Sequence, residues 1–207
     1  MLMRTLHFHP LSSFCQKALI ALYELDLPFE RRFVDLGAAT DREALARLWP
    51  FCRFPVLEDG GRVFAESSII VEHLGPGLIP SDREAALECR FLDRVFDLHV
   101  NEPVGKVVTD LLRPDGAHDV MGVARARDTL RTAYGVLDAR LRDRTWAAGD
   151  AFTLADCAAA PALFYAVRIE PFQHPHLTAY FERLLARPSV ARTFEEARPY
   201  LHLFPVK

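Results

Sequence analysis

Apolar and polar positions follow two different periods along the chain, and the change between them predicts two kinds of structure. Over 1–75, short apolar runs with a period of two alternate with segments whose apolar residues recur every three or four positions. The predicted order is strand, helix, strand, helix, hairpin and helix, at 5–9, 14–25, 29–36, 40–49, 55–64 and from 66 onward. Strands that alternate with helices predict a partly parallel sheet whose faces the helices cover.

Turn and capping residues mark the ends of several of these elements. Asp59-Gly60-Gly61 supplies hairpin turn residues between two short apolar strands. Pro55 cannot donate to a ladder, so it indicates a strand start or an edge. Thr40-Asp41-Arg42-Glu43 has the pattern of a capping box. Trp49-Pro50 ends the helix that follows this box, because the residue before a proline avoids helical backbone angles.

Beyond a linker at 75–80 the pattern is helical only. Capping-box patterns begin helices at Ser81 and Thr153, and the helix over 157–167 is apolar nearly all round, which predicts a central position. We expect Pro103 to kink or end the helix that follows Ser81. That helix carries two apolar rows, Leu87, Phe91, Val95 and Leu98 in one and Leu92, Phe96 and Val100 in the other. So wide a stripe must face both the core and a dimer partner or ligand cleft. The predicted architecture is an α/β domain over 1–75 and an all-α domain over 81–207.

Composition narrows the class of partner. The chain has 207 residues, a formal net charge of −3 and no long basic run, which argues against nucleic acid or an anionic membrane as a partner. No segment approaches the roughly 18 apolar residues that span a bilayer. The four cysteines, Cys15, Cys52, Cys89 and Cys157, form no C-x-x-C pair, and the histidines show no metal-ligand spacing. We therefore expect a cytoplasmic protein without a metal, whose partner is a small molecule.

The Glu66-Ser67 step at the start of the third helix is a candidate binding site. The first N–H groups of a helix have no partner inside it and lie at the positive end of its dipole, so they bind a carboxylate readily. Ser67 adds a hydroxyl donor and Glu66 can bind an ammonium group, so the pair suits an α-amino acid head group. The alternative is that Ser67 is only a helix cap.

Three motifs resemble the cytosolic glutathione transferase family over essentially the whole chain. They are Phe54-Pro55-Val56-Leu57 with its hairpin and Glu66-Ser67, the run Ala148–Asp156 around the second capping box, and the segment from His176 to Val190. The resemblance implies a thioredoxin-like α/β domain, an all-α domain, glutathione as co-substrate and a homodimer. On this resemblance the chain is identified as a serine-type member of bacterial origin, similar to the zeta, theta and delta classes.

The resemblance also implies which residues activate the glutathione thiol. A free thiol with a pKa near 8.5 is only about 3% ionised at pH 7, and lowering this pKa by roughly two units makes most of it nucleophilic. Ser12 aligns with the hydroxyl that donates to the sulfur, and Ser13 is the neighbouring candidate. Cys15 in the first helical turn is either a reactive thiol or a small buried residue. Lys17 is either a nearby cation or a solvated side chain.

The binding residues follow from the same resemblance, in which the proline is cis and the residue before it pairs with the cysteinyl backbone of glutathione. The residues expected to bind glutathione are Phe14, Arg42, Arg53, Phe54, Pro55, Glu66 and Ser67. Arg42 or Arg53 would bind the glycyl carboxylate, because Cys52 replaces the residue that often does so. The electrophile pocket is expected from Leu11, Phe96, His99, Val100 and Pro103. Asp93 and Asp97 either reach a glutamyl ammonium across a dimer or are ordinary surface carboxylates.

The expected activity is conjugation of the glutathione thiolate to a small hydrophobic electrophile. Because Ser12 cannot form a mixed disulfide, conjugation is favoured over disulfide exchange. A glutathione-dependent isomerase or dehalogenase is the alternative within enzymes, since the family reuses one thiolate for several reactions. A non-catalytic interaction or regulatory protein with the same fold is the alternative from another class.

Overall fold

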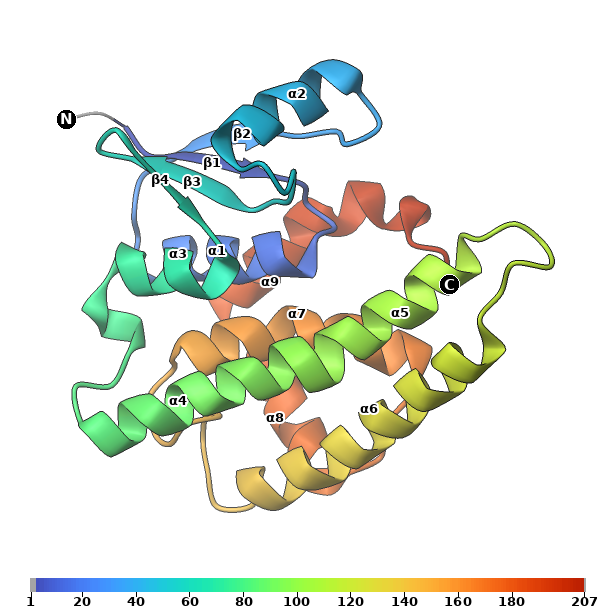
Figure 1. The fold of residues 1–207 in the computed structure, drawn as a ribbon. Helices are drawn as coiled ribbons and strands as arrows, with labels where there is room; N and C mark the ends of the chain where they lie inside the picture. Colours follow the sequence, from blue (N-terminus) through green and yellow to red (C-terminus); the bar gives the residue numbers. More distant parts are fainter. Residues whose placement is uncertain (1–2, 207) are drawn as a thin grey trace.

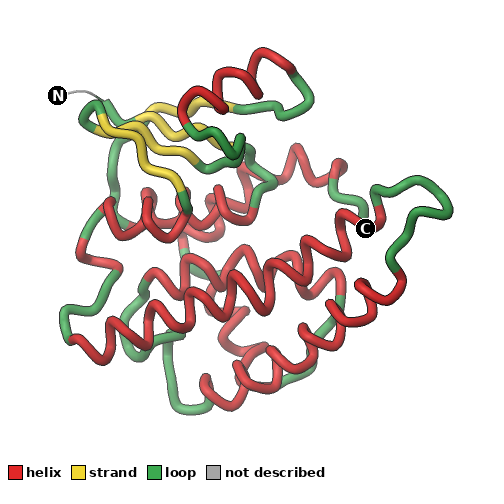
Figure 2. Tube along the Cα trace, viewed as in Figure 1, coloured by secondary structure: helices red, strands yellow, loops and turns green. Residues whose placement is uncertain are grey.

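The computed structural model describes residues 3–206 and confirms the predicted fold class (Figures 1 and 2). Within these residues the strands are β1 (Thr5–Phe8), β2 (Glu30–Phe33), β3 (Val56–Asp59) and β4 (Arg62–Ala65). They form one sheet in the order β2-β1-β3-β4, with β1 parallel to β2 and the other pairs antiparallel. Gly60 and Gly61 have φ values of 59° and 77° at the hairpin turn, a region that glycine enters without strain.

Helices cover both faces of this sheet. Helices α1 (Ser13–Glu24) and α3 (Ser67–Leu74) lie on the face toward the all-helical part, and α2 (Ala39–Leu48) lies on the opposite face (Figure 1). A small apolar cluster of Val34, Leu45 and Val56 packs α2 onto the sheet. The much larger cluster on the other face continues without a break into the helical part, because α1 packs against α7 and α9.

The predicted capping box at Thr40 is wrong. Helix α2 begins one residue earlier, and no side chain caps it. The polar residues of this segment bind the preceding loop instead: the Asp41 carboxylate accepts the N–H of Asp35 at 2.9 Å, and Arg42 donates to two loop carbonyls at 2.8 and 3.0 Å. The loop thus uses the groups that would otherwise cap the helix.

The second part contains helices only, within the described residues. They are α4 (Arg83–Val95), α5 (Glu102–Leu111), α6 (Val120–Leu141), α7 (Leu154–Ile169), α8 (Pro175–Leu185) and α9 (Pro188–Ala197), with short 3₁₀ segments at Pro76–Leu78 and Arg198–Leu203. The cap of α4 is Asp82, whose carboxylate accepts the N–H of Ala85 at 2.9 Å, so the prediction of Ser81 as this cap is wrong. Asp82 gains from the helix dipole as well as from the hydrogen bond.

The regular helix that follows Asp82 is interrupted shortly before Pro103, since α4 ends at Val95. Between α4 and α5 the residues Phe96–Asn101 form a wider π-helical turn, and the N–H of Glu102 bonds to the carbonyl of Asp97. Pro103 is the second residue of α5 and directly follows this wider turn. The wider turn is a feature that often accompanies functional sites.

The two apolar rows of this helix have different fates. Leu92, Phe96 and Val100 are at most 1% exposed and belong to the core. In the other row Val95 is buried, but Leu87, Phe91 and Leu98 are 58%, 43% and 42% exposed. The second row therefore leaves an apolar surface along α4.

Helix α7 is central, as its composition predicts, and the capping box at its start is confirmed. All but two of its residues are buried. The fully buried Asp156 carboxylate accepts the N–H of Thr153 at 2.8 Å, the N–H of Ala147 at 2.8 Å and the hydroxyl of Tyr180 at 2.7 Å. One carboxylate thus joins the 146–149 turn, α7 and α8.

Replacement of Asp156 by alanine should destabilise the whole protein. Several buried donors lose their acceptor at once, so we expect the free energy of unfolding to fall by more than about 3 kcal/mol in urea denaturation. The exposed Asp150→Ala variant in the same segment is the control and should change little. Equal effects of the two variants would contradict this role.

Candidate functional site

A cavity of about 570 Å³ lies where the sheet part meets helix α4. Its walls come from α1, from the segment before β3, from the start of α3, and from α4 with the wider turn after it. Six of the residues predicted to bind glutathione line this one cavity: Phe14, Arg53, Phe54, Pro55, Glu66 and Ser67. Trp49, Ile69 and Leu98 add apolar surface.

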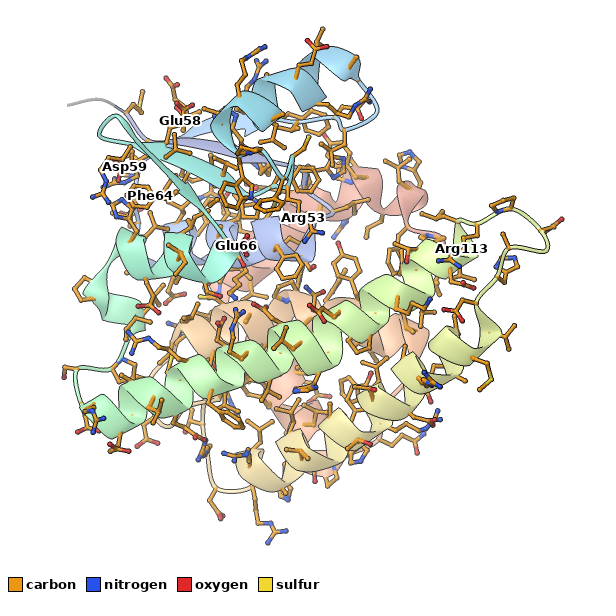
Figure 3. All side chains as sticks on the ribbon, viewed as in Figure 1. Arg53, Glu58, Asp59, Phe64, Glu66 and Arg113 are labelled. Carbon is orange, nitrogen blue, oxygen red and sulfur yellow. The ribbon has the colours of Figure 1, made fainter. Side chains whose placement is uncertain are left out.

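The segment before β3 forms one wall. The Phe54–Pro55 peptide bond is cis, and the Phe54 ring packs against both apolar clusters of the sheet part. Arg53 is exposed and has no hydrogen bond or ion pair with any other described residue. In Figure 3, Arg53 and Glu66 lie on the same side of the small domain, close to where it meets the helices. The cavity is therefore lined by a cation and a carboxylate that have no partner among the described residues.

The start of α3 forms the second wall. Glu66 precedes the helix with φ 67° and ψ 118°, a backbone region that non-glycine residues rarely adopt and that often marks functional sites. The N–H of Ile70 makes the first intrahelical bond, to the carbonyl of Glu66 at 2.9 Å. The N–H groups of residues 67–69 are therefore free for a bound anion, with the Ser67 hydroxyl among them. Glu66, not Ser67, occupies the cap position.

Ser12 and Ser13 differ in geometry although they are adjacent. Ser12 is the cap of α1, and its hydroxyl oxygen accepts the N–H of Cys15 at 3.3 Å. Its own proton remains available to a further acceptor, and a hydroxyl that already accepts a bond is the better donor. Ser13 is the first helical residue, with no hydrogen bond recorded for its side chain among the described residues. Both are half-buried, and neither lines the cavity directly.

Cys15 is the buried alternative rather than a reactive thiol. Its side chain is 0% exposed, and burial raises its pKa to about 12, although hydrogen bonding at Ser12 acts in the opposite direction. A thiol with such a pKa is protonated at neutral pH and is a poor nucleophile. The hypothesis of a catalytic Cys15 is therefore corrected.

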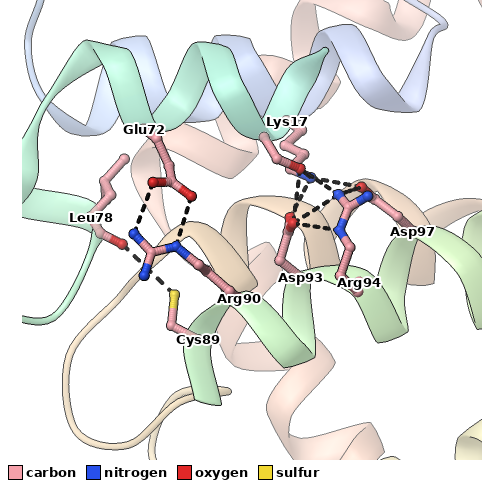
Figure 4. Close-up of polar contacts among 9 residues, drawn as sticks. Lys17, Glu72, Leu78, Cys89, Arg90, Asp93, Arg94 and Asp97 are labelled. Carbon is pink, nitrogen blue, oxygen red and sulfur yellow. Dashed lines mark hydrogen bonds and ion pairs between the residues drawn. The ribbon is translucent and has the colours of Figure 1, made fainter. Parts of the chain in front are cut away.

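Lys17 is not solvated, and the partners of its ammonium group lie on α3, on α4 and in the turn after α4. Its side chain is 1% exposed, and its ammonium group is ion-paired with Asp93 and, at 2.9 Å, with Asp97 (Figure 4). It also donates to the Ser68 hydroxyl at 2.9 Å. Burial raises the pKa of the Asp97 carboxyl, while Lys17 acts in the opposite direction. We call Lys17, Ser68, Asp93, Arg94 and Asp97 the ionic cluster.

The ionic cluster fixes the start of α3 against α4. The Ser68 hydroxyl donates to Asp93 at 2.8 Å, and Arg94 reaches both carboxylates from the cavity side (Figure 4). Lys17, Asp93 and Asp97 are buried, and the half-exposed Arg94 supplies the second cation that balances the two carboxylates. Asp93 and Asp97 are therefore partners of Lys17 within one chain and not free surface carboxylates.

The structure does not bring the predicted electrophile residues to the cavity. Phe96 and Val100 are 0% exposed in the core, and Pro103 is buried, so an incoming substrate cannot reach them in this conformation. His99 is exposed on the wider turn but does not line the cavity. Leu11 is half-buried beside Ser12. Phe96 and Val100 are covered because they belong, with Leu92, to the row of this helix that faces the core.

Arg42 also lies away from the cavity. Its guanidinium group is engaged by loop carbonyls, which leaves Arg53 as the arginine of the predicted pair that lines the site. The half-buried Cys52 has φ 51°, and its thiol lies 3.4 Å from the carbonyl of Arg42. Cys52 thus joins the segment before β3 to helix α2.

Sequence reasoning missed the ionic cluster, although a signal was present. Lys17 stands inside a run of buried, mostly apolar positions on α1, and a lysine is almost never fully buried unless it is paired. Asp93, Arg94 and Asp97 place a cation and two carboxylates on one helix face.

No metal site formed by three or more histidine, cysteine or acidic side chains occurs within residues 3–206. No helix in that range is both long and apolar enough to cross a bilayer.

Comparison with known proteins finds two matching family models. Residues 6–75 match the N-terminal domain of glutathione S-transferases, and residues 105–188 match their C-terminal domain. Glutathione S-transferase 3 of Zea mays is 34% identical over 89% of this chain and 90% of its own length. FtsZ-localized protein A of Caulobacter vibrioides is 33% identical over 77% of this chain and 75% of its own. A crystal structure of a glutathione S-transferase from Methylobacillus flagellatus with glutathione bound superposes with a TM-score of 0.84, at 25% identity over 92% of this chain and 98% of that one.

Removal of the Lys17 charge should destabilise the protein strongly. In Lys17→Met, two neighbouring buried carboxylates keep only Arg94, so we expect the free energy of unfolding at pH 7 to fall by about 3–5 kcal/mol. Loss of the cation raises the pKa of Asp97 further in the folded state, which then favours protonation. The deficit relative to wild type should therefore shrink as the pH is lowered toward about 5.

Denaturation curves at several pH values test this expectation. Lys106→Met is the matched control, since Lys106 pairs with Asp119 at the surface, where an ion pair contributes little. A Lys17→Met deficit that is small or independent of pH would show that the carboxylates do not depend on this cation.

Proposed function

The chain belongs to the glutathione S-transferase family, and from this premise we propose that it is a serine-type glutathione transferase in which Ser12 activates the thiol. The observation that carries the proposal is the oriented Ser12 hydroxyl at the start of α1, beside a cavity that gathers the cis Phe54–Pro55 bond, Arg53 and Glu66-Ser67. The proposed reaction joins the glutathione sulfur to a small hydrophobic electrophile.

Ser12 acts by stabilising the thiolate. Its hydroxyl oxygen accepts the N–H of Cys15, which leaves its proton to donate to a sulfur in front of the helix. The positive end of the α1 dipole favours negative charge at the same place. Hydrogen bonding to the charged form and a positive local potential both lower a thiol pKa. The thiolate is the nucleophile in every reaction considered for this protein.

The cavity complements the two ends of glutathione. The free N–H groups at the start of α3 and the Ser67 hydroxyl suit the γ-glutamyl carboxylate, and Glu66 suits its ammonium group. The unpaired Arg53 suits the glycyl carboxylate. The backbone of Phe54, before the cis proline, suits the cysteinyl amide between them. Each charged group of the ligand thus meets a group of opposite sign.

The nature of the electrophile follows from the apolar part of the cavity. Phe14, Trp49 and Leu98 line it, which suits a small apolar compound. Displacement of a halide and isomerisation use the same thiolate and remain the alternatives within enzymes.

The unpaired thiols and the absence of a spanning helix among the described residues fit our expectation of a cytoplasmic protein.

A non-catalytic role is the second candidate, favoured by the similarity to FtsZ-localized protein A. Such a protein can keep the fold without using the thiol-activating loop. The two candidates differ in one measurable property, which is the pKa of the thiol of bound glutathione.

We further propose that the chain forms a homodimer through α4. Leu87, Phe91 and Leu98 form an exposed apolar row there, beside the exposed Ile69 of α3. A contiguous apolar surface of this kind is typical of protein–protein contact. The row borders the cavity through Ile69 and Leu98, so a partner placed on it would shield the site from water.

Replacement of Ser12 by alanine should abolish thiol activation. We expect wild type to lower the thiol pKa of bound glutathione by about two units from roughly 8.5, and Ser12→Ala to return it toward that value. The thiolate absorbance in the ultraviolet as a function of pH measures this. Ser12→Ala should also lose about 1 kcal/mol of stability, because it removes a helix cap.

Ser13→Ala is the control for this experiment and should leave the thiol pKa unchanged. If Ser13→Ala alone abolishes the shift, the neighbouring hydroxyl is the activator. If wild type binds no glutathione, or binds it without lowering the thiol pKa, the transferase proposal fails and the non-catalytic role is the better account.

A charge placed in the apolar row should weaken the dimer. Leu87→Asp introduces a carboxylate that would be desolvated at the contact, so we expect sedimentation equilibrium to show a dissociation constant at least about tenfold higher than that of wild type. Leu112→Asp is the control, since Leu112 is 67% exposed at the far end of α5. A monomeric wild type, or equal effects of both variants, would contradict the α4 contact.

A further inference from the structure

The backbone immediately before Ser12 is held by side chains rather than by regular secondary structure. The Pro10 carbonyl accepts from the Gln16 amide at 2.8 Å, and the Leu11 carbonyl accepts from the Tyr165 hydroxyl at 2.9 Å. The Leu11 N–H donates to Nδ1 of His9 at 3.2 Å. Three successive polar groups of the 10–11 backbone are thus bound by side chains, and none of these hydrogen bonds belongs to a helix or a strand.

Gln16 and Tyr165 form a connected pair. The Gln16 amide nitrogen donates to the Tyr165 hydroxyl at 3.0 Å as well as to the Pro10 carbonyl. The Tyr165 hydroxyl in turn donates a hydrogen bond to the Leu11 carbonyl. This pattern fixes the orientation of the amide, because a carbonyl and a donating hydroxyl both require the nitrogen side. Gln16 is 0% exposed and Tyr165 is 3% exposed. Water therefore does not compete for these bonds.

Tyr165 belongs to the all-helical part of the molecule. It lies on α7, the most buried helix, and its ring packs against Phe164 and against Phe204 from the C-terminal segment, with ring centroids 5.2 and 5.0 Å apart. The hydroxyl is therefore held by a rigid element with little freedom to follow the loop. Through it, the helical part determines where the Leu11–Ser12 peptide lies.

We propose that Tyr165, together with Gln16, is a positioning residue for thiol activation, because it fixes the peptide that carries Ser12. This inference rests on the proposed function, since it concerns how the Ser12 hydroxyl is aimed. Tyr165 does not line the cavity.

We call the hydrogen bonds from Gln16 and Tyr165 to the 10–11 backbone the clamp. The geometry explains why the clamp matters for Ser12 in particular. The side chain of Ser12 has one fixed contact, the 3.3 Å bond from Cys15, which is long for a hydrogen bond to a hydroxyl oxygen. The direction of the hydroxyl therefore depends on the backbone angles at Ser12. These angles are set on one side by α1 and on the other by the clamped Leu11 carbonyl. Without the clamp, the peptide can rotate while the helix stays intact.

The test is the thiol pKa of bound glutathione in Tyr165→Phe, measured from thiolate absorbance. We expect the pKa to rise by about 0.5 to 1 unit toward the free value, while the affinity for glutathione changes less than about threefold. A merely structural role would lower the melting temperature without moving the thiol pKa. Gln16→Met should shift the pKa in the same direction, and the double variant should shift it by less than the sum.

Tyr134→Phe is the matched control. Tyr134 is 1% exposed and donates to a backbone carbonyl, that of Glu170, at 2.9 Å, but it lies on α6 and does not contact the loop. It should lose similar stability and leave the thiol pKa unchanged.

The possible outcomes separate this inference from the proposed function. If wild type lowers the thiol pKa and Tyr165→Phe lowers it equally, the inference is overturned and the transferase proposal stands. If wild type does not lower it, the proposed function fails first. Should Tyr165→Phe not fold, Gln16→Met tests the clamp from the side of α1, and an unchanged thiol pKa there would overturn the inference.

Discussion

The enclosure of helix α1 is the constraint on which the rest of the structure depends. The sheet covers one side of this helix and α7 covers another, so the residues Cys15–Leu22 are all buried. Two of them, Gln16 and Lys17, are polar, and a buried polar group without partners costs several kcal/mol. The Gln16 amide nitrogen finds its partners in the loop before Ser12 and on α7, although its Oε1 has no partner among the described residues, while Lys17 finds its partners on α3, on α4 and in the turn after α4. Adjacent residues on one helix thereby hold the loop that carries Ser12 on one side and join the start of α3 to α4 on the other.

The sequence predicts the elements well because they depend on local patterns. The hairpin at Gly60-Gly61, the cis-proline wall and the Thr153 capping box are each encoded within a few residues, and all are present in the structure. The capping box at Thr40 failed because the loop before α2 competes for the same polar side chains. Phe96, Val100 and Pro103 do not line the cavity because they face the core, and periodicity alone did not indicate which apolar row of the helix does so. The clamp on Ser12 joins residues 149 positions apart, which no local pattern can indicate.

The same scaffold carries different kinds of function among the relatives of this chain, which include plant glutathione S-transferases and FtsZ-localized protein A. The shared fold fixes the cavity between the sheet and α4 but does not oblige a protein to use it. In this chain the charged groups of the cavity divide into two kinds. Arg90 and Glu72 are paired with each other, as are the members of the ionic cluster, whereas Arg53 and Glu66 have no partner among the described residues (Figure 4). Glu102, which also lines the cavity, has no partner among the described residues either, but Arg53 and Glu66 are the opposite charges that a zwitterionic ligand can neutralise.

The π-helical turn at Phe96–Asn101 changes the rotational phase of the helix that contains it. Each residue of a regular helix advances by about 100°, so a turn with one extra residue shifts everything after it by that angle. Before the turn, the outward apolar row on α4 is available to another molecule; after it, Pro103, Val104 and Val107 of α5 face inward. The first part of this long helix thus presents one apolar row to the core and a second row to solvent, whereas after the turn Pro103, Val104 and Val107 face the core.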